Sequence, residues 1–374
     1  MSTMRELVLP GFVEAILSRL HACGFSAFVV GGCVRDALRG APPSDWDVCT
    51  SALPSEVQAS LCTFRIIETG LAHGTLTVLS DGNPVEVTTY RIDGAYRDLR
   101  HPESVTFTED LTLDLARRDF TINAMAYSPD VGLVDPFHGA EDLAANLLRC
   151  VGDPDTRFSE DALRILRALR FSATLGCSIH PDTARSILRS AKNLKYIASE
   201  RITAELCKLV LGDSAHRVLT DFAPVFALLG VTGTLPTNAP PILTVRLAHL
   251  LTQDSLSRFR LPKAIANRIE LLWKHRDTPL IDLRCLIGTL GRDATRELLL
   301  YRDAHTSVWA AYAAAEPLCC TISELAVNGS DLRAIGFSTG PAMGRCLQTL
   351  LDAVLDDKLP NERDALLQFA KNLK

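Results

Sequence analysis

The sequence predicts an α+β fold, in which a small mixed or antiparallel sheet occupies the first part of the chain and helices form the rest. Segments rich in Val, Thr and Tyr, which favour strands, all occur before residue 130: "AFVVGG", "GTLTVLS", "PVEVTTYRI" and "NAMAYS". From about Asp142 onward such segments nearly vanish, and apolar residues recur at the spacing typical of helices.

The elements follow one another in a clear order. An amphipathic helix is expected over "GFVEAILSRLHACGF", where Gly24 ends the pattern, and the strands come next. Beyond them "RFSEDALRILRALRFSATLG", "HPDTARSILRSAKNL" and "SERITAELCKLVLG" have helical periodicity, and proline-rich stretches mark later connections. We therefore expect four parts: an α/β head at 1–137, then an all-α neck at 138–210, body at 211–315 and tail at 316–374.

Composition excludes several classes of protein. No apolar run approaches the roughly 18 residues that a membrane-spanning helix needs, and the N-terminus does not resemble a signal peptide. The 11 cysteines lack Cys-x-x-Cys spacing, which favours reduced thiols over a disulfide framework or a zinc site. We therefore expect a cytoplasmic protein with no membrane partner.

Two motifs lie within one short stretch after the first predicted strand. Gly31 and Gly32 allow a sharp turn and close approach to a ligand, and "CVRDALRG" predicts a helix whose start would attract phosphate, with Arg35 as a charged donor. Asp45 and Asp47 would share one face of a strand, roughly 6–7 Å apart, where carboxylates can bind Mg²⁺. Each motif alone is common in ordinary turns and loops. Together they indicate a nucleotidyl-transfer site.

Glu86, in the predicted strand "PVEVTTYRI", is a candidate third catalytic carboxylate beside Asp45 and Asp47. Apolar residues flank it, and a buried acid on a neighbouring strand needs a partner or a metal. The sequence leaves a structural glutamate, satisfied by its own partner, equally open.

In this order the motifs resemble those of the class II tRNA nucleotidyltransferase and bacterial poly(A) polymerase family. After "GGCVRDALRG" and "DWDV" come "HGTLTV", "VEVTTYRIDGAYRDLRHPESVTF", "DLARRDFTINAMAY", "DPFHG", "RFSEDALRILRALRF" and "SERITAEL", and "NGSDLRAIGFSTGPAMG" resembles the family's C-terminal motif. The resemblance implies a nucleotidyltransferase head that extends an RNA 3′ end without a nucleic-acid template. It also implies two-metal catalysis with Mg²⁺ on Asp45 and Asp47 and release of pyrophosphate.

The resemblance also implies a nucleotide-binding set in the head. Gly32 and Arg35 would position the phosphates of the nucleotide. In "RRDFTINAMAY", Arg118 would contact the nucleotide, and Asp119 would orient the arginines or the ribose. The plain alternative for the two arginines of this motif is a basic pair on the surface.

The segment "EDALRILRALRF" would supply a protein template for the incoming base. We expect one helix with Ser159 as its N-cap, so that Asp161 and Arg164 are surface neighbours and Arg167 and Arg170 continue the row. The plain alternative is a surface ion pair. By resemblance, Asp161 accepts from the amino group of cytosine or adenine, and Arg164 donates to the adjacent acceptor. Uracil and guanine present the reverse order, so the pair would reject them.

The positive charge of one helical segment favours an RNA partner. The segment from Arg157 to Lys208 holds ten Lys or Arg and five Asp or Glu, which is a local net charge of about +5 in a chain whose formal net charge is −5. Such a segment fits contacts to RNA phosphates, although a solvated charged face stays an alternative for 185–195. We expect tRNA to bind through its 3′ end and acceptor arm, with CTP and ATP as substrates.

The loop "YRIDGAYRDLRHPESVTFTEDL", with Arg91, Asp93, Tyr96 and Arg97, argues against relatives that add only C. The tail lacks the basic extension expected of poly(A) polymerases. We therefore expect addition of C, C and A, with A-only addition as the closest alternative. A catalytically silent RNA-binding relative would bind tRNA and consume no nucleotide. The sequence leaves a homodimer open.

Overall fold

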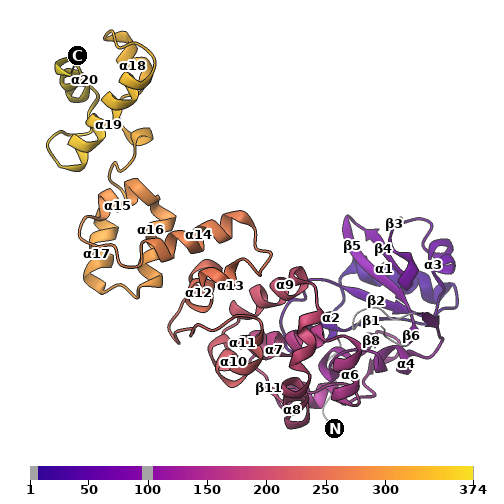
Figure 1. The fold of residues 1–374 in the computed structure, drawn as a ribbon. Helices are drawn as coiled ribbons and strands as arrows, with labels where there is room; N and C mark the ends of the chain where they lie inside the picture. The colour runs from indigo at the N-terminus through magenta and orange to yellow at the C-terminus, as the bar shows by residue number, and fades with distance from the viewer. Residues whose placement is uncertain (1–6, 95–103, 374) are drawn as a thin grey trace. The chain divides into compact units, whose positions relative to one another are not determined.

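The computed structural model describes residues 7–94 and 104–373. These form two compact units: Met1–Thr232 with Ser257–Arg260, and Gly233–Leu256 with Leu261–Lys374. Every strand among the described residues lies in the first unit, whereas the described part of the second unit is helical, so the α+β prediction is confirmed (Figure 1). The finer division at residues 137, 210 and 315 stays a prediction.

The main sheet has seven strands in the order β3-β4-β5-β2-β1-β8-β9. β2 and β5 run parallel and the other neighbours run antiparallel, so the sheet is mixed, as expected. The strands are β1 (Ala27–Val30), β2 (Asp47–Thr50), β3 (Arg65–Gly70), β4 (Thr75–Ser80), β5 (Asn83–Thr89), β8 (Ala126–Ser128) and β9 (Gly132–Val134). Two small sheets pair β6 (Arg91–Asp93) with β7 (Val105–Phe107) and β10 (Leu147–Leu148) with β11 (Ser178–Ile179).

Short helices connect and cover these strands. They are α1 (Gly11–Ala22), α2 (Gly32–Leu38), α3 (Pro54–Ser60), η1 (Leu71–His73), α4 (Leu111–Ala116), η2 (Thr121–Asn123) and α5 (Gly139–Ala144). One core cluster joins β1 to the segments that carry the arginine motif, through Phe28, Val30, Leu115 and Ala124. Burial of such apolar side chains holds the ends of β1, β2 and α4 together.

The rest of the first unit is helical, as its periodicity predicts. Its elements are α6 (Pro154–Glu160), α7 (Leu163–Leu175), α8 (Pro181–Ser190), η3 (Ala191–Tyr196), α9 (Ser199–Val210), α10 (Ala215–Asp221) and α11 (Ala223–Leu228). Asp153 is the N-cap of α6: its carboxylate accepts from Thr156 N at 2.9 Å, and Pro154 is the first residue of the helix. The prediction that Ser159 caps a helix here is wrong, because Ser159 lies inside α6.

The second unit contains α12 (Leu243–Leu250), α13 (Gln253–Leu256), α14 (Lys263–Lys274), α15 (Leu283–Leu290), α16 (Arg292–Tyr301), α17 (Thr306–Ala315), η4 (Ile322–Glu324), α18 (Gly329–Ala334), α19 (Pro341–Leu355) and α20 (Arg363–Asn372). Arg284 on α15 donates to the Val354 carbonyl at 3.0 Å and to Asp357 at 2.6 Å. It thereby satisfies carbonyls at the end of α19.

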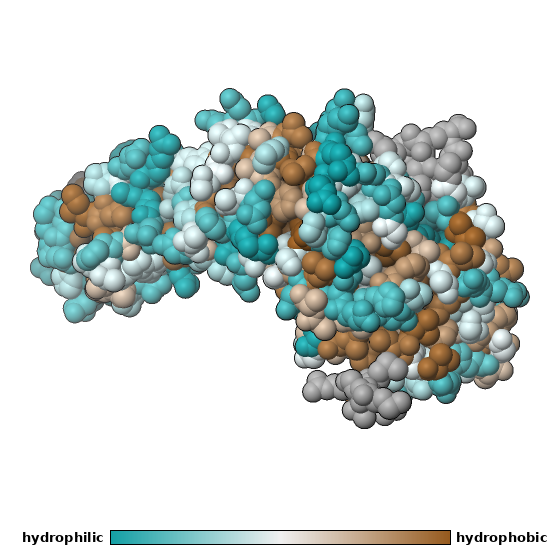
Figure 2. All heavy atoms as spheres, turned by 90° about the horizontal axis from the view of Figure 1, so that it is seen from below, coloured by the Kyte–Doolittle hydropathy of each residue, from teal (hydrophilic) through white to brown (hydrophobic). Residues whose placement is uncertain are grey.

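Hydrophilic residues cover much of the face drawn in Figure 2, and hydrophobic residues appear between them. The large apolar side chains with the greatest exposure come from separate segments, such as Val8, Val131 and Ile281. Scattered exposure of this kind is ordinary for a folded domain. Within residues 7–94 and 104–373, no helix combines the length and apolarity needed to cross a bilayer.

Candidate active site

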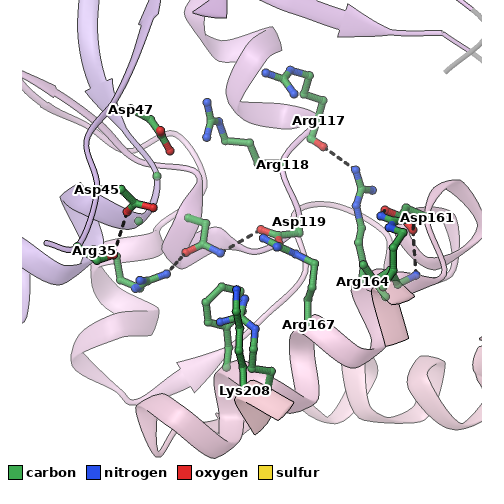
Figure 3. A pocket seen from close by; sticks show the side chains of 18 residues that line it. Arg35, Asp45, Asp47, Arg117, Arg118, Asp119, Asp161, Arg164, Arg167 and Lys208 are labelled. Carbon is green, nitrogen blue, oxygen red and sulfur yellow. Dashed lines mark hydrogen bonds and ion pairs between the residues drawn. The ribbon is translucent and has the colours of Figure 1, made fainter. Parts of the chain in front are cut away.

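A pocket of about 600 Å³ lies within the first unit, where the ends of β2 and α4 meet α7 and α9 (Figure 3). Its walls carry eight cationic and four acidic side chains, which gives a net charge of +4. The cations are Arg35, Arg117, Arg118, Arg164, Arg167, Arg170, Arg201 and Lys208, and the acids are Asp45, Asp47, Asp119 and Asp161. A cationic concave surface of this size suits a polyphosphate ligand.

Asp45 and Asp47 lie on one side of the pocket. β2 begins only at Asp47, and exposed Asp45 precedes it in a loop, so the prediction that both lie on one strand is wrong for Asp45. The Asp45 carboxylate accepts from Ser44 Oγ at 3.1 Å. Both aspartates nevertheless line the pocket, with Asp47 half-buried at the start of its strand.

Glu86 lies on β5, in register with Asp47 across the parallel pair. The prediction of a neighbouring strand is therefore confirmed. The expected burial is wrong, because Glu86 is exposed, and it does not line the pocket. Paired residues in adjacent strands project from the same face of a sheet, so the two carboxylates repel each other across the strand pair.

Asp45, Asp47 and Glu86 bring three negative charges close together, and we call this part of the site the acidic side. Burial, followed by the nearby charges of Asp45 and Glu86, raises the pKa of Asp47 to about 6. A cation would relieve that repulsion, and carboxylate oxygens are the ligands that hard divalent ions prefer. The donor set therefore fits a divalent cation. The described residues contain no group of three or more His, Cys, Asp or Glu gathered to hold a metal, so a bound ion would draw further ligands from substrate or water.

The glycine turn brings backbone close to an arginine. Gly31 has φ +82° and precedes α2, and a Cβ on it would lie 3.1 Å from Arg118 Nη1. Gly32, by contrast, has ordinary space for a Cβ, 3.7 Å from Arg35 Nη2. Both glycines line the pocket, but the conformational requirement for glycine falls on Gly31.

Asp114 holds both arginines of the "RRDFT" motif. Its fully buried carboxylate accepts from Arg117 Nε at 2.9 Å and Nη2 at 2.7 Å, and from Arg118 Nη2 at 3.2 Å. Burial alone would raise the pKa of Asp114, but Arg118 and Arg117 lower it below its ordinary value. The buried Arg118 Nε–H has no partner among the described residues. Both guanidiniums are thus fixed in the pocket, contrary to the plain surface alternative.

A second chain of hydrogen bonds crosses the pocket floor. Arg35 Nη1 donates to Asn123 Oδ1 at 2.7 Å, Asn123 Nδ2 donates to Asp119 Oδ1 at 3.0 Å, and Asp119 Oδ2 pairs with Arg167 at 2.6 Å. Although burial alone would raise it, Arg167 and Asn123 lower the pKa of Asp119 to about 2. Asp119 thus orients one arginine, Arg167 from α7, rather than its two sequence neighbours. The guanidinium of Arg35 is also neutralised by Asp36.

Asp161 and Arg164 lie on the other side of the pocket from Asp45 and Asp47. The expected single helix is wrong, because α6 ends before Asp161, whose backbone is extended at φ −135° and ψ 104°. The Asp161 carboxylate accepts from Leu163 N at 2.9 Å at the start of α7. Arg164 pairs with Glu160 and donates to the Arg117 carbonyl at 3.1 Å. The two do not form the surface ion pair of the plain alternative.

Arg170 and Arg167 both lie against the aromatic ring of Phe171 on α7. Arg170 lies 3.9 Å and Arg167 5.5 Å from the centre of the Phe171 ring, a cation–π geometry. Arg170 Nε also donates to Glu205 on α9 at 2.6 Å. The four residues predicted from "EDALRILRALRF" therefore all line one pocket, each with a partner outside the expected set.

Sequence reasoning missed several lining residues. Arg201 and Lys208 come from α9, Asn123 from η2 and Phe171 from α7. In the sequence, Arg201 and Lys208 count only toward the basic segment expected to contact RNA, and their spacing of seven residues, which puts them on one face of a helix, is the signal that could have assigned them to the pocket. Tyr96 and Arg97 of the loop motif lie outside the described residues, while Arg91 and Asp93 form an ion pair in β6.

Three family models match parts of this chain. Residues 27–149 match the family model "Poly A polymerase head domain", residues 176–222 match "Probable RNA and SrmB- binding site of polymerase A", and residues 307–370 match the model of tRNA nucleotidyltransferase domain 2. The head match contains Asp45, Asp47 and both arginines held by Asp114.

Two relatives that match over nearly their full length are both CCA-adding enzymes. The chain is 35% identical to a CCA-adding enzyme of Leuconostoc citreum, over 96% of this chain and 95% of the relative. It is 36% identical to a CCA-adding enzyme of Lacticaseibacillus paracasei, over 98% of each. The crystal structure of the Bacillus stearothermophilus CCA-adding enzyme in complex with CTP superposes with a TM-score of 0.78 at 32% identity, over 98% of each chain. The chain therefore belongs to the tRNA nucleotidyltransferase family of the bacterial CCA-adding enzymes.

Proposed function

We propose that this chain is a CCA-adding enzyme, which adds C, C and A to the 3′ end of tRNA from CTP and ATP and releases pyrophosphate. One observation carries the proposal: a single cationic pocket holds an acidic pair on one side and the Asp161 and Arg164 pair on the other. The full-length similarity to CCA-adding enzymes, one of them solved with CTP, supports the choice of substrates.

The acidic side suits a metal-assisted reaction. Members of this family use divalent metal ions, and we propose Mg²⁺ held by Asp45 and Asp47, with Glu86 adding negative charge beside them. Mg²⁺ is usually bound by one or two carboxylates together with substrate phosphates and water. The chemistry that such ions supply when bound is activation of the tRNA 3′ hydroxyl and neutralisation of the triphosphate charge, in a two-metal arrangement.

The arginines hold the triphosphate in position for an in-line displacement. The buried Arg118 Nε–H has no hydrogen-bond partner among the described residues, its guanidinium is held by Asp114, and Arg35 and Gly32 line the same pocket. The 3′ hydroxyl oxygen forms a bond to the α-phosphorus while the bond from that phosphorus to pyrophosphate breaks. No covalent intermediate with the protein is needed. Arginines already held by carboxylates need little reorganisation when substrate binds, which favours catalysis.

Base selection falls to Asp161 and Arg164, with Arg167 and Arg170 completing this wall of the pocket. The carboxylate only accepts hydrogen bonds and the guanidinium only donates them. Cytosine and adenine each present an amino donor next to a ring acceptor and match this pair. Uracil and guanine present an oxygen and an N–H in the opposite order, and a mismatch at buried polar groups opposes binding by several kcal/mol. The protein itself therefore acts as the template.

Three tRNA transcripts test the proposal, ending before CCA, after C and after CC. Each is incubated with Mg²⁺ and with CTP, ATP, UTP or GTP alone or with CTP and ATP together, and the products are sized to one nucleotide. Completion of all three to CCA, followed by a stop, is the expected result. Extension of only the CC-ending transcript by one A would assign A-only addition, and long A tails would assign poly(A) synthesis. Binding of tRNA without any extension would assign a silent RNA-binding protein.

The cysteines support a cytoplasmic location. All eleven are unpaired, including the buried Cys33 and Cys49, and burial raises the pKa of the Cys33 thiol to about 11. Buried thiols without disulfides suit a reducing compartment. We propose that the protein acts in the cytoplasm.

A further inference from the structure

The carboxylate proposed to read the base is itself held from a different helix. Arg201 on α9 donates from Nη2 to Asp161 Oδ2 at 2.9 Å and from Nη1 to Asp161 Oδ1 at 3.5 Å. Leu163 N donates to the same Oδ1 at 2.9 Å. Both side chains are mostly buried, with 25% of Arg201 and 16% of Asp161 exposed. The ion pair therefore lies in a setting where charge-assisted hydrogen bonds are strong.

Asp161 needs such a constraint because of where it lies in the chain. It falls between α6 and α7, with extended backbone, so no helical turn fixes the direction of its side chain. The bond from Leu163 N anchors only one carboxylate oxygen, about which the group can still rotate. The two-pronged contact from Arg201 anchors the second oxygen and thereby sets the plane of the carboxylate.

One face of α9 carries residues that line the pocket or hold one of its lining side chains. Arg201, Glu205 and Lys208 are spaced i, i+4 and i+7, so they lie on one side of the helix. Glu205 holds Arg170 at 2.6 Å, in the same way that Arg201 holds Asp161. The outward neighbour Glu200 instead forms an exposed ion pair with Arg260 at 3.5 Å. One side of the helix thus holds Asp161 and Arg170 in the pocket, and Glu200 lies on the side exposed to solvent.

We infer that Arg201 is a positioning residue for base choice: it fixes the plane of the Asp161 carboxylate so that this group accepts from the amino group of cytosine or adenine. This inference rests on the proposed function. A carboxylate free to rotate can turn an oxygen away from that amino group and no longer repels the carbonyl oxygen of uracil or guanine at the same place. Selectivity between the bases therefore depends on α9 as well as on the residues that touch the base.

The test measures kcat/KM for CTP, ATP, UTP and GTP on the matching transcripts. The variants are Arg201→Ala and Arg201→Gln, with Arg201→Lys as the conservative variant and Glu200→Gln as the matched control on the same helix. For Arg201→Ala and Arg201→Gln we expect a fall of about 10- to 100-fold with CTP and ATP, the range for losing a hydrogen bond to a charged group. We expect a smaller fall with UTP and GTP, so that discrimination narrows by about tenfold. Arg201→Lys should recover part of the loss and Glu200→Gln should match the wild type.

A double-mutant cycle tests whether Arg201 affects discrimination between the bases through Asp161. If Arg201 acts through Asp161, then Arg201→Gln adds no further loss of discrimination to Asp161→Ala. Additive losses would show that Arg201 acts independently of Asp161 and would overturn the inference. An equal fall of kcat/KM with all four nucleotides would also overturn it, and so would unchanged discrimination between them. Wild-type protein that adds no nucleotide would overturn the proposed function and the inference with it. Wild-type addition of C and A with unchanged discrimination in Arg201→Gln would overturn the inference alone.

Discussion

Asp119→Asn tests whether the ionic network on the pocket floor stabilises the fold. The substitution keeps the size of the side chain but removes the charge that pairs with Arg167 at 2.6 Å. The pKa of Asp119, lowered from 3.8 to about 2, corresponds to about 2 kcal/mol of stability in the folded state. Only 9% of this side chain is exposed, so solvent screening reduces that figure little. We expect Asp119→Asn to lower the free energy of unfolding by about 2 kcal/mol at pH 7.

The pH dependence follows from the direction of the shift. Because the pKa is lower in the folded state, the stabilisation is complete above about pH 4 and is lost as the pH falls towards 2. Urea unfolding of wild type and Asp119→Asn, followed by circular dichroism, should show a difference in unfolding free energy that is about 1 kcal/mol smaller at pH 3 than at pH 7. Asp81→Asn is the matched control, since Asp81 is an exposed turn residue at φ +49°, a conformation that Asn accepts. A difference that is constant from pH 7 to pH 3 would refute the ionic explanation.

Three further predictions concern the pocket. Asp47→Ala removes a proposed metal ligand and should abolish nucleotide addition while tRNA binding, measured by filter retention, stays near wild type; retained turnover would contradict the metal assignment. Asp161→Ala combined with Arg164→Ala should raise incorporation of UTP and GTP relative to CTP and ATP in single-nucleotide assays, and unchanged selection would exclude the protein template. Gly31→Ala forces a side chain into φ +82° and against Arg118, so the melting temperature should fall by the equivalent of about 1–2 kcal/mol and KM for the nucleotide should rise. A normal KM in that variant would show that Arg118 does not depend on the turn.

The strand–turn–helix at the start of the head was predictable because its signals are local. The apolar run of β1, the glycines and the short helix α2 all appear where the sequence places them. The break before α7 was not predictable in this way. "EDALRI" contains no Gly or Pro, and the chain leaves the helix at Asp161 because that carboxylate binds Leu163 N and Arg201. A partner 40 residues away overrides the local helix propensity.

In the site too, residues that belong to a local sequence pattern could be predicted, whereas contacts between distant segments could not. The glycine turn and the Asp-x-Asp spacing predict Asp47 as a site residue, whereas Arg118 and Arg164 are expected from the family resemblance; all three line the pocket. The carboxylates that hold the arginines are harder to predict. Asp114 precedes its arginines by three and four residues, a spacing that favours ion pairs on a helix, so the sequence contained that signal. Glu205 binds Arg170 across two helices, and no sequence pattern reports such a contact.

The bonds from Arg35 through Asn123 and Asp119 to Arg167 also bear on how this protein can change over evolution. The first three residues precede the expected head boundary at 137, and the fourth follows it. A recombination event near that boundary would join Asp119 from one parent to α7 from another. If that α7 lacked the arginine at position 167, the buried charge of Asp119 would lose its partner. Head and neck should therefore be inherited as one block, so that phylogenies drawn from either segment alone agree.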